Sequence, residues 1–327
     1  MTDKKIWVLA DNRAGNTAQA LGVAEAFAGD VDVKTVCYTQ AAFLPNMFRG
    51  DSTLGVATET IAALNEPFPD VAVAAGRRAA PLLRYIKKKS GGKTKIVQIM
   101  FPGYFGLADF DLIVLPNHDG CKLVRPNIMR VTGAPHRITP ERLEAEKEKW
   151  SPVFASLPSP RIAVIVGGAT KNKPFTTEMA SDLAKRAKGL LSVLGGGGSF
   201  LVTTSRRTGA AQEKIICDML PEPKFFYSWG NKEVENPYFG FLALADHIIV
   251  TGDSVSMCSE ACASGAPVYI YAPQGTVGRK HALLHQELYR EGYAVELTKN
   301  PMPVLHGGGK RLNAAQEIAA RIAEMVG

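Results

Sequence analysis

The sequence predicts an α/β protein made of two Rossmann-like domains that face each other across a cleft. Short apolar segments alternate with segments of helical length, a pattern typical of a parallel sheet covered by helices on both faces. The alternation stops once, near the middle of the 327 residues, and then starts again. This length suits two domains of ordinary size.

The first half of the chain contains six expected strands. The first covers residues 5–10 and ends in a polar loop, Asp11–Asn16, which leads into a helix. A parallel sheet buried on both faces needs such near-continuous apolar runs. The remaining strands are expected at 31–38, 71–75, 95–100, 112–115 and 128–132, with helices near 53–64 and 77–89.

A change of composition marks the predicted domain boundary. Residues 139–150 are highly charged, and prolines follow at 152, 158 and 160, as in many interdomain linkers. We therefore expect an N-terminal domain of residues 1–150 and a C-terminal domain of residues 151–327. The last helix, residues 312–327, is expected to pack back on the N-terminal domain.

The second half repeats the architecture of the first. Open α/β sheets bind ligands outside the carboxyl ends of their strands, so functional residues are sought in the loops that follow them. The expected strands are 161–166, 199–204, 224–227, 247–250 and 267–271, with the longest helix at 176–194.

Composition narrows the class of protein. The formal net charge is +7, but the basic residues are spread along the chain, which argues against a nucleic-acid partner. The run Lys87–Lys89 ends a helical segment, where it is either a solvated face or an anion-binding surface. Five cysteines without regular spacing, and no leader before the first strand, predict reduced thiols in the cytoplasm. No apolar run reaches the ~20 residues of a membrane span.

The most informative segment is residues 248–271, in which a strand, a polar turn, a short helix, Gly-x-Pro and a second strand follow one another. Ser254 and Ser256 lie at the start of the helix, where free amides and the helix dipole favour an anion. Glu260 could accept hydrogen bonds from ribose hydroxyls. Alternatively, Asp253 or Ser254 only caps the helix and Glu260 is a surface residue.

This segment, with its Ser259-Glu260-Ala261 and Gly265-Ala266-Pro267, resembles the donor-nucleotide motif of GT-B glycosyltransferases. Together with the opening at 7–19 and Gly-Ala-Pro-His at 133–136, it is similar to the "elongated mitochondria" fission family, which is related to those enzymes. The resemblance implies that residues 151–327 bind the donor and residues 1–150 the acceptor. It also implies that Glu260 holds the ribose, with three residues near the diphosphate: Ser254, Val255 and Ser256.

The opening loop supplies a candidate catalytic base. The family motif reads Asp-x-x-x-Gly-(acidic or His)-x-x-Gln, which Asp11, Gly15 and Gln19 match. Position 16 is Asn16, which cannot act as a base. Asp11, at the end of the first strand, is therefore the candidate that would take a proton from an acceptor hydroxyl. The alternative is that Asp11 forms an Asx-turn or caps the next helix.

Two further loops are candidates for phosphate binding. Gly167 and Gly168 follow the first strand of the second half, and their small size would let backbone amides approach a phosphate, although glycine is common in such turns. Arg206 or Arg207 could form paired hydrogen bonds with a diphosphate leaving group. The alternative is that both arginines are surface residues at a helix entry.

Three functions follow. The first is a nucleotide-sugar glycosyltransferase without a bound cofactor, because inverting displacement needs one base and no metal. Residues 42–49 are its candidate patch for a lipid-linked or membrane-associated acceptor, which would place the protein at the periphery of the inner membrane. The second, implied by the resemblance, is a non-catalytic scaffold that recruits a protein partner. The third is a serine hydrolase at Ser254, with His281 or His285 as base. The spacing of these histidines is compatible with a metal site, but position 282 lacks the glutamate of zinc proteases, and no metal is expected.

Overall fold

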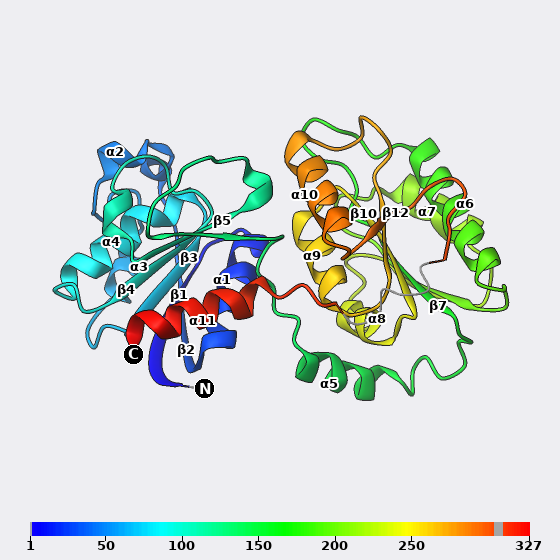
Figure 1. Cartoon of the computed structure of the whole chain (residues 1–327), viewed down its shortest axis with the longest axis horizontal. Coiled ribbons are helices and arrows are strands. Elements are labelled where there is room, and N and C mark those ends of the chain that lie inside the picture. The colour runs from blue at the N-terminus through cyan, green and yellow to red at the C-terminus, as the bar shows by residue number, and fades with distance from the viewer. Residues whose placement is uncertain (1, 304–309) are drawn as a thin grey trace. The chain divides into compact units, whose positions relative to one another are not determined.

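The computed structural model describes residues 2–303 and 310–327, which form two compact units. Unit 1 comprises Met1–Arg137 and Asn313–Gly327, and unit 2 comprises Ile138–Leu312. Both are α/β units with a central sheet (Figure 1). The division falls before helix α5 (Pro140–Trp150) and not after it, because Trp150 is buried in the core of unit 2.

Unit 1 is built on a six-stranded parallel sheet with the strand order β2-β1-β3-β4-β5-β6. The strand expected at 31–38 starts earlier and ends at Thr35, and the helix expected at 53–64 is a single turn. The elements of unit 1 before its last helix are β1 (Thr2–Ala10), α1 (Ala14–Phe27), β2 (Ala28–Thr35), α2 (Asn46–Arg49), α3 (Thr58–Ala62), β3 (Val71–Ala75), α4 (Ala80–Lys89), β4 (Lys95–Ile99), β5 (Leu112–Pro116) and β6 (Ile128–Val131).

Both faces of this sheet are buried, which explains its continuous apolar strands. Side chains alternate between the faces, so Ile6 and Val8 of β1 join one core cluster while Trp7 and Leu9 join the other. Helix α1 covers the first face and α4 the second. The carboxyl ends of the strands are left free for the loops that carry polar residues.

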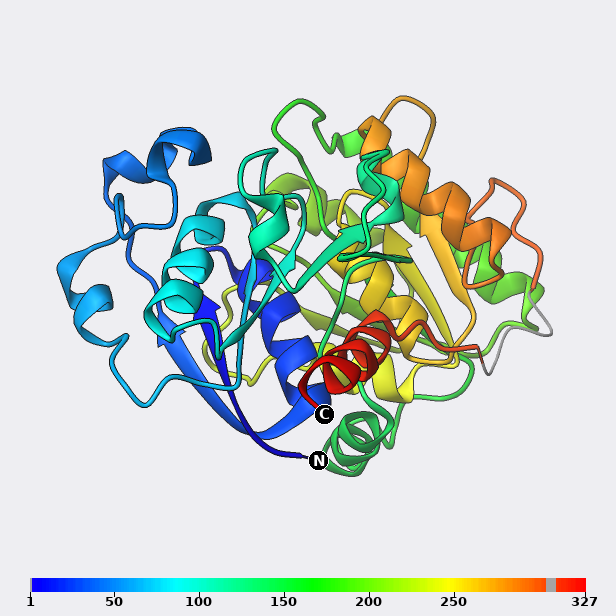
Figure 2. The same ribbon diagram turned by 60° about the vertical axis from the view of Figure 1, so that its left-hand side comes forward.

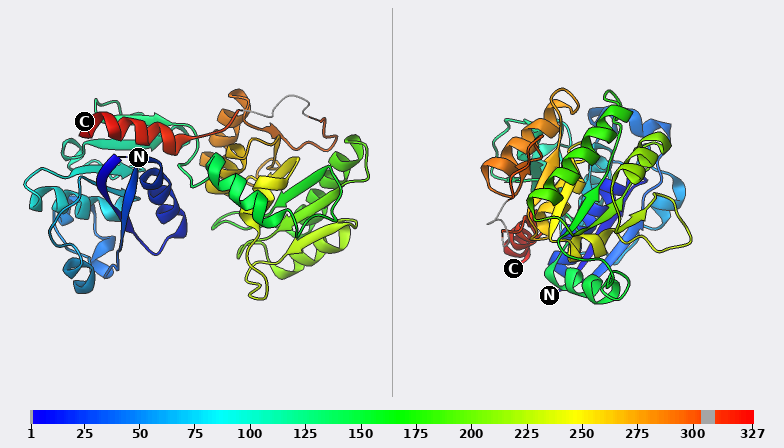
Figure 3. Two further views of the ribbon diagram at one scale, coloured as in Figure 1. Left: turned by 90° about the horizontal axis from the view of Figure 1, so that it is seen from below. Right: turned by 90° about the vertical axis from the view of Figure 1, so that its right-hand side faces the viewer.

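The C-terminal helix α11 (Ala314–Val326) belongs to unit 1. It packs beside α1 (Figure 2). Its apolar side chains Ala314, Ile318 and Ile322 are buried in the same cluster as β1. Both ends of the described chain therefore lie in unit 1 (Figure 3). Helix α11 is therefore part of unit 1 although it follows unit 2 in the sequence.

Unit 2 also has a six-stranded parallel sheet, in the order β12-β11-β10-β7-β8-β9. Renumbered from β7, this is the 3-2-1-4-5-6 order of the Rossmann fold. The short last strand was not expected. The elements are β7 (Arg161–Ile165), α6 (Thr177–Val193), β8 (Ser199–Thr203), α7 (Ala210–Met219), β9 (Lys224–Tyr227), α8 (Tyr238–Leu244), β10 (His247–Thr251), α9 (Val255–Ala263), β11 (Val268–Tyr271), α10 (Arg279–Arg290) and β12 (Val295–Glu296).

Helices cover both faces of the second sheet as well. Helix α6 buries Leu183 and Ala187 against one face, and α9 buries Cys258 and Ala261 against the other. The second cysteine of α9, Cys262, is buried in the same cluster as Cys258. This packing fixes α9 so that its first turn opens at the carboxyl ends of the strands.

Candidate functional site

Each sheet reverses its strand order at one point, and ligands of open α/β sheets bind at such switch points. In unit 1 the reversal lies between β1 and β3, and in unit 2 between β7 and β10. The loops after these strands carry the polar residues singled out from the sequence. Asp11 follows β1, Gly167 and Gly168 follow β7, and Ser254 follows β10.

The glycine turn after β7 fits tightly against its neighbours. A Cβ added at Gly167 would lie 2.3 Å from Oδ2 of Asp253, and one at Gly168 would lie 2.1 Å from the carbonyl oxygen of Arg207. The amide of Gly167 already donates to Oγ1 of Thr251 at 2.7 Å. Within the described part of the chain, only the amide of Gly168 in this pair has no hydrogen-bond acceptor. The turn therefore offers one amide to a phosphate, fewer than expected.

Arg207 and Asp253 form an ion pair at the switch point. A guanidinium nitrogen of Arg207 lies 2.8 Å from Oδ2 of Asp253, and its other terminal nitrogen donates to the carbonyl of Ala169 at 3.1 Å. The Asp253 side chain is buried, and the approach of Arg207 lacks hydrogen-bond geometry. Arg206, the other candidate, is exposed. Of the two arginines, only Arg207 is held at the switch point.

The start of α9 is a capped helix N-terminus. Ser254 is the N-cap residue, and its hydroxyl accepts a hydrogen bond from the amide of Met257. Ser254 therefore caps helix α9, as the alternative interpretation predicted. The next two residues, Val255 and Ser256, contribute first-turn amides that have no partner inside the helix. These amides and the helix dipole favour an anion in front of the helix.

Glu260 lies on the second turn of α9, with its carboxylate directed to another helix. It accepts a hydrogen bond of 2.5 Å from the hydroxyl of Tyr238, the first residue of α8. Burial raises the pKa of Glu260 to about 6, and the hydrogen bond from Tyr238 and the charge of Arg142 oppose this rise. Glu260 is thus neither a free surface residue nor an open acceptor, because a ribose would have to compete with Tyr238.

The two histidines of α10 lie close to the same loop. His281 is near Asp253; burial lowers its pKa and the charge of Asp253 acts in the opposite direction. His285 is buried, and a Cβ added at Gly252 would lie 2.4 Å from its ring. In the described residues, no group of three or more His, Cys, Asp or Glu is placed to hold a metal ion.

Asp11 is held at the switch point of unit 1. Its carboxylate accepts hydrogen bonds from the amide of Arg13 at 2.9 Å, the side chain of Asn16 at 3.2 Å and the guanidinium of Arg78 at 2.9 Å. The contact with Arg13 is an Asx-turn, which is the structural role given above as the alternative for Asp11. The side chain of Asp11 is only 5% exposed. A role as base remains a prediction and requires substrate access to this carboxylate.

A cavity of about 110 Å³ opens beside Asp11. Arg13, Arg77 and Arg78 line it, together with Phe43. The guanidinium of Arg78 also lies 4.7 Å from the ring centroid of Tyr38, and burial, followed by the charge of Asp11, raises the pKa of that tyrosine to about 12. Three arginines around one small cavity define a cationic pocket, which we call the arginine pocket.

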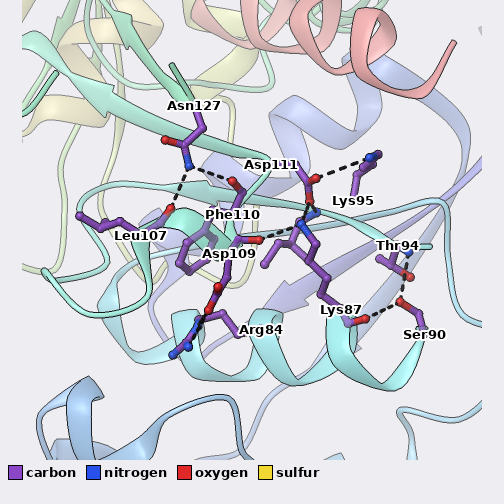
Figure 4. Close-up of polar contacts among 11 residues, drawn as sticks. Arg84, Lys87, Ser90, Thr94, Lys95, Leu107, Asp109, Phe110, Asp111 and Asn127 are labelled. Carbon is purple, nitrogen blue, oxygen red and sulfur yellow. Dashed lines mark hydrogen bonds and ion pairs between the residues drawn. The ribbon is translucent and has the colours of Figure 1, made fainter. Parts of the chain in front are cut away.

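The lysine run at the end of α4 forms ion pairs rather than an open cationic surface (Figure 4). Lys87 lies 2.8 Å from Asp111, and Arg84 lies 2.6 Å from Asp109. Lys88 pairs with Asp51 at 2.9 Å. Asp109-Phe110-Asp111 has the Asp-x-Asp spacing of metal-dependent transferases, but it precedes β5, at the edge of the sheet opposite the ligand-binding ends.

The second Asp-x-Asp spacing in the chain, Asp30-Val31-Asp32, lies within β2. Asp32 is 2.9 Å from Lys34 and 3.9 Å from Lys5. Asp32 of this spacing, like Asp111 of the first, therefore forms ion pairs with two lysines.

Two site residues, Arg78 and Tyr238, were not predicted from the sequence, and a third, Asp253, was given a different role. Arg78 has a local signal, because Gly76-Arg77-Arg78 directly follows β3 at the switch point. Asp253 was considered only as a helix cap, and its pairing with Arg207 links loops 46 residues apart. Tyr238 has no local signal, because its partner Glu260 lies on a different helix.

The fold is that of GT-B-like proteins. Against a crystal structure of UDP-GlcNAc 2-epimerase from Neisseria meningitidis, the TM-score is 0.52 at 12% identity, with 98% of this chain and 99% of that chain covered. Against Spinosyn Forosaminyltransferase SpnP it is 0.50 at 12% identity, with 99% and 95% covered. At these identities the likeness shows the fold alone: two α/β units, each with a parallel six-stranded sheet.

The chain belongs to the family described as Mitochondrial fission ELM1, which matches residues 14–326. The uncharacterized protein RP120 of Rickettsia prowazekii is 31% identical, over 96% of each chain. The Mitochondrial fission protein ELM1 of Arabidopsis thaliana is 32% identical over 62% of this chain and 51% of the plant protein. None of the described helices has the length and apolar character needed to cross a membrane.

Proposed function

We propose that this protein is a metal-independent glycosyltransferase that binds a nucleotide-sugar donor in unit 2. One observation carries the proposal: the switch point between β7 and β10 brings together the start of α9, the amide of Gly168 and the guanidinium of Arg207. Amides and a cation at such a position suit a diphosphate. Stabilising the charge of a departing nucleoside diphosphate needs donors of this kind.

The recognition of the nucleoside is proposed to centre on Glu260. A carboxylate that already accepts a hydrogen bond from a hydroxyl, that of Tyr238, has the chemistry to accept one from a ribose. Trp229, 55% exposed and following β9, offers an aromatic surface for a base. In this proposal Tyr238 is the residue that the ribose displaces.

Binding of UDP-GlcNAc, UDP, GDP and CDP should be measured by titration calorimetry. UDP-GlcNAc heads the panel because the Neisseria meningitidis epimerase, which has the same fold, was solved bound to it. We expect one ligand of the panel to bind, and Arg207→Gln to weaken it at least about tenfold through loss of a charge-assisted contact. Glu260→Gln should weaken nucleosides but not pyrophosphate.

Lys214→Gln is the matched control, because Lys214 is an exposed cation of unit 2 that pairs with Asp218 on α7. It should leave the affinity unchanged. If no nucleotide of the panel binds, or if Lys214→Gln weakens binding as much as Arg207→Gln, the assignment of the diphosphate site is wrong.

The family relationship favours a second candidate, a scaffold that recruits a protein partner, because one relative is a Mitochondrial fission protein of Arabidopsis thaliana. Capture of a specific partner without any nucleotide binding would support it. The serine hydrolase is less well supported. Ser254 has an ordinary extended backbone, with φ −129°, rather than the strained turn of a nucleophile elbow. Labelling of Ser254 by a fluorophosphonate would revive that candidate.

A further inference from the structure

Helix α2 in unit 1 has its polar residues inside and its apolar residues outside. Asn46 and Arg49 are buried, whereas Met47 is 60% and Phe48 66% exposed. In a helix that only supports a fold, the apolar residues face the core. This inverted arrangement needs an explanation outside the core of unit 1.

The buried polar residues hold the exposed ones in place. The side chain of Asn46 donates to the carbonyl of Arg77 at 3.0 Å and to that of Pro102 at 2.7 Å. Arg49 donates to the carbonyls of Leu54 and Arg78. The apolar side chains are therefore presented on a fixed support of hydrogen bonds.

A second segment adds aromatic residues to the same face. In the segment after β4, the side chain of Tyr104 is 81% exposed and that of Phe105 is 46% exposed. Phe43, which precedes α2, is 71% exposed. Met47 and Tyr104 line one apolar groove of about 410 Å³, whose other residues are Pro45, Asn46, Arg77, Pro102, Gly103 and Phe105. We call the exposed side chains of residues 43–48 and 104–105 the apolar face. Contiguous exposed apolar surface of this kind marks an interaction site.

The apolar face is flanked mainly by cations, and Asp11 is the one acid of the described chain that lines the arginine pocket. Residues 40–50 and 100–106 contain no Asp or Glu. Arg77 lines both the apolar groove and the arginine pocket, so the two cavities share a wall. Among the described residues, neither Arg77 nor Arg13 has an ion pair with an acid, whereas Asp109 beyond the second segment is paired with Arg84. Cations flanking an apolar face complement an anionic, apolar partner.

We propose that unit 1 docks on an anionic lipid bilayer, with the apolar face in the acyl region and a phosphate headgroup in the arginine pocket. A surface of aromatic and aliphatic side chains next to free cations has the composition of interfacial membrane anchors. A cavity of about 110 Å³ admits a phosphate but not a large ligand. The inference goes beyond the proposed function and does not depend on nucleotide binding by unit 2.

Sedimentation of the full chain with lipid vesicles tests the proposal. We expect binding to vesicles of phosphatidylcholine containing phosphatidylglycerol, and at least about tenfold weaker binding to phosphatidylcholine alone. Phe43→Ser/Phe48→Ser should weaken binding about tenfold or more because two aromatic anchors are lost. Arg13→Gln/Arg77→Gln should weaken it by a similar factor and reduce its sensitivity to salt.

Two matched controls distinguish binding by the apolar face and the arginine pocket from nonspecific binding through any exposed apolar side chain or any exposed cation. Val124→Ser changes a side chain of unit 1 that is 90% exposed but lies in neither segment, and Lys88→Gln removes a cation of the lysine run. Both should leave vesicle binding unchanged. All substituted residues are exposed, so circular dichroism should show an unaltered fold.

A soluble headgroup distinguishes a membrane from a small anion. Glycerol phosphate should bind at least about a hundredfold more weakly than vesicles, because it lacks the chains that enter the apolar groove. The proposal fails if glycerol phosphate binds as well as vesicles, since the pocket would then serve a soluble phosphate. It also fails if neither vesicle binds, or if Lys88→Gln has the effect expected of Arg13→Gln/Arg77→Gln.

Discussion

Oδ2 of Asp253 lies 2.8 Å from the guanidinium of Arg207, and this pair joins two loops at the carboxyl edge of the second sheet. The aspartate and the arginine have opposite effects on an anion that arrives there. Arg207 attracts it, while the buried charge of Asp253 repels it and occupies the cation that it would use. In the proposed function, this pair would set how strongly a diphosphate is held.

Removing the charge of Asp253 should strengthen binding of a diphosphate. In Asp253→Asn, Arg207 loses its carboxylate partner, and we expect the affinity for the nucleotide ligand to rise several-fold, about 1 kcal/mol. Titration calorimetry with the ligand found in the panel measures the change. Arg207→Gln should act in the opposite direction, and the double variant should bind more tightly than Arg207→Gln alone, because the repulsion by Asp253 is also removed. Weaker binding in Asp253→Asn would show instead that the aspartate holds Arg207 in its active position.

Two glycines of unit 2 should respond oppositely to alanine. A Cβ at Gly167 meets the carboxylate of Asp253 at 2.3 Å, so we expect Gly167→Ala to lower the free energy of unfolding by about 1–3 kcal/mol. Gly189, inside α6, is the control, because a Cβ there makes an ordinary 3.6 Å contact with Pro301. Gly189→Ala should stabilise by about 0.5–1 kcal/mol. Urea unfolding measures both; equal effects would contradict the tight fit of the glycine turn.

The pKa of Glu260 gives unit 2 a pH-dependent stability. It is raised to about 6 in the folded protein from 4.5, so the folded state binds more protons than the unfolded state between these values. Stability therefore falls as the pH rises through this window. Relative to wild type, Glu260→Gln should gain about 1 kcal/mol between about pH 5 and about pH 7.5.

Urea unfolding of both proteins at the two pH values checks this difference. Tyr238→Phe is the companion variant, because it removes the hydrogen bond that lowers the pKa of Glu260. The window in which its stability changes should extend to higher pH. A pH dependence that is the same in wild type and Glu260→Gln would mean that this carboxylate titrates alike in both states.

Asp11 has a structural role that must be separated from any role as base. Asp11→Asn breaks a buried ion pair with Arg78 and should reduce the free energy of unfolding by about 3 kcal/mol. Arg78→Gln should cost a similar amount, and the double variant less than the sum, because the two share one interaction. Urea unfolding of the four proteins gives the coupling.

A catalytic role of Asp11 is tested by the rate of sugar transfer rather than by the free energy of unfolding. If Asp11 takes the proton of the acceptor, Asp11→Asn should reduce the rate of sugar transfer at least about a hundredfold with donor affinity unchanged. Arg78→Gln is the control for stability, because it keeps the carboxylate. Transfer by Asp11→Asn at the wild-type rate would leave Asp11 with its structural role only.

The fold was predictable because its signals are local. The alternating apolar segments identified eleven of the twelve strands in the described residues, and the two-residue β12 was missed. The domain boundary was less accurate, because residues 139–150 read as a charged linker while Trp150 is buried by stacking on Phe154. Its burial depends on a partner surface that composition does not reveal.

The candidate site was only partly predictable for the same reason. Ser254 and the glycine turn have local patterns, so their positions at the strand ends could be inferred. The partners of Glu260 and Arg207, which are Tyr238 and Asp253, come from other elements and are fixed by packing. The inverted polarity of α2 also shows only in the folded structure, since the sequence of residues 42–49 does not reveal which side chains face outward.

The docking of α11 on α1 has a consequence for biosynthesis. Ala314, Ile318 and Ile322, which pack on one face of the sheet of unit 1, are synthesised only after all of unit 2. During translation the part of this face that α1 does not cover stays exposed until all of unit 2 has been made. We therefore expect nascent chains that end before residue 313 to be recognised by chaperones through unit 1, while unit 2 acquires protease resistance first.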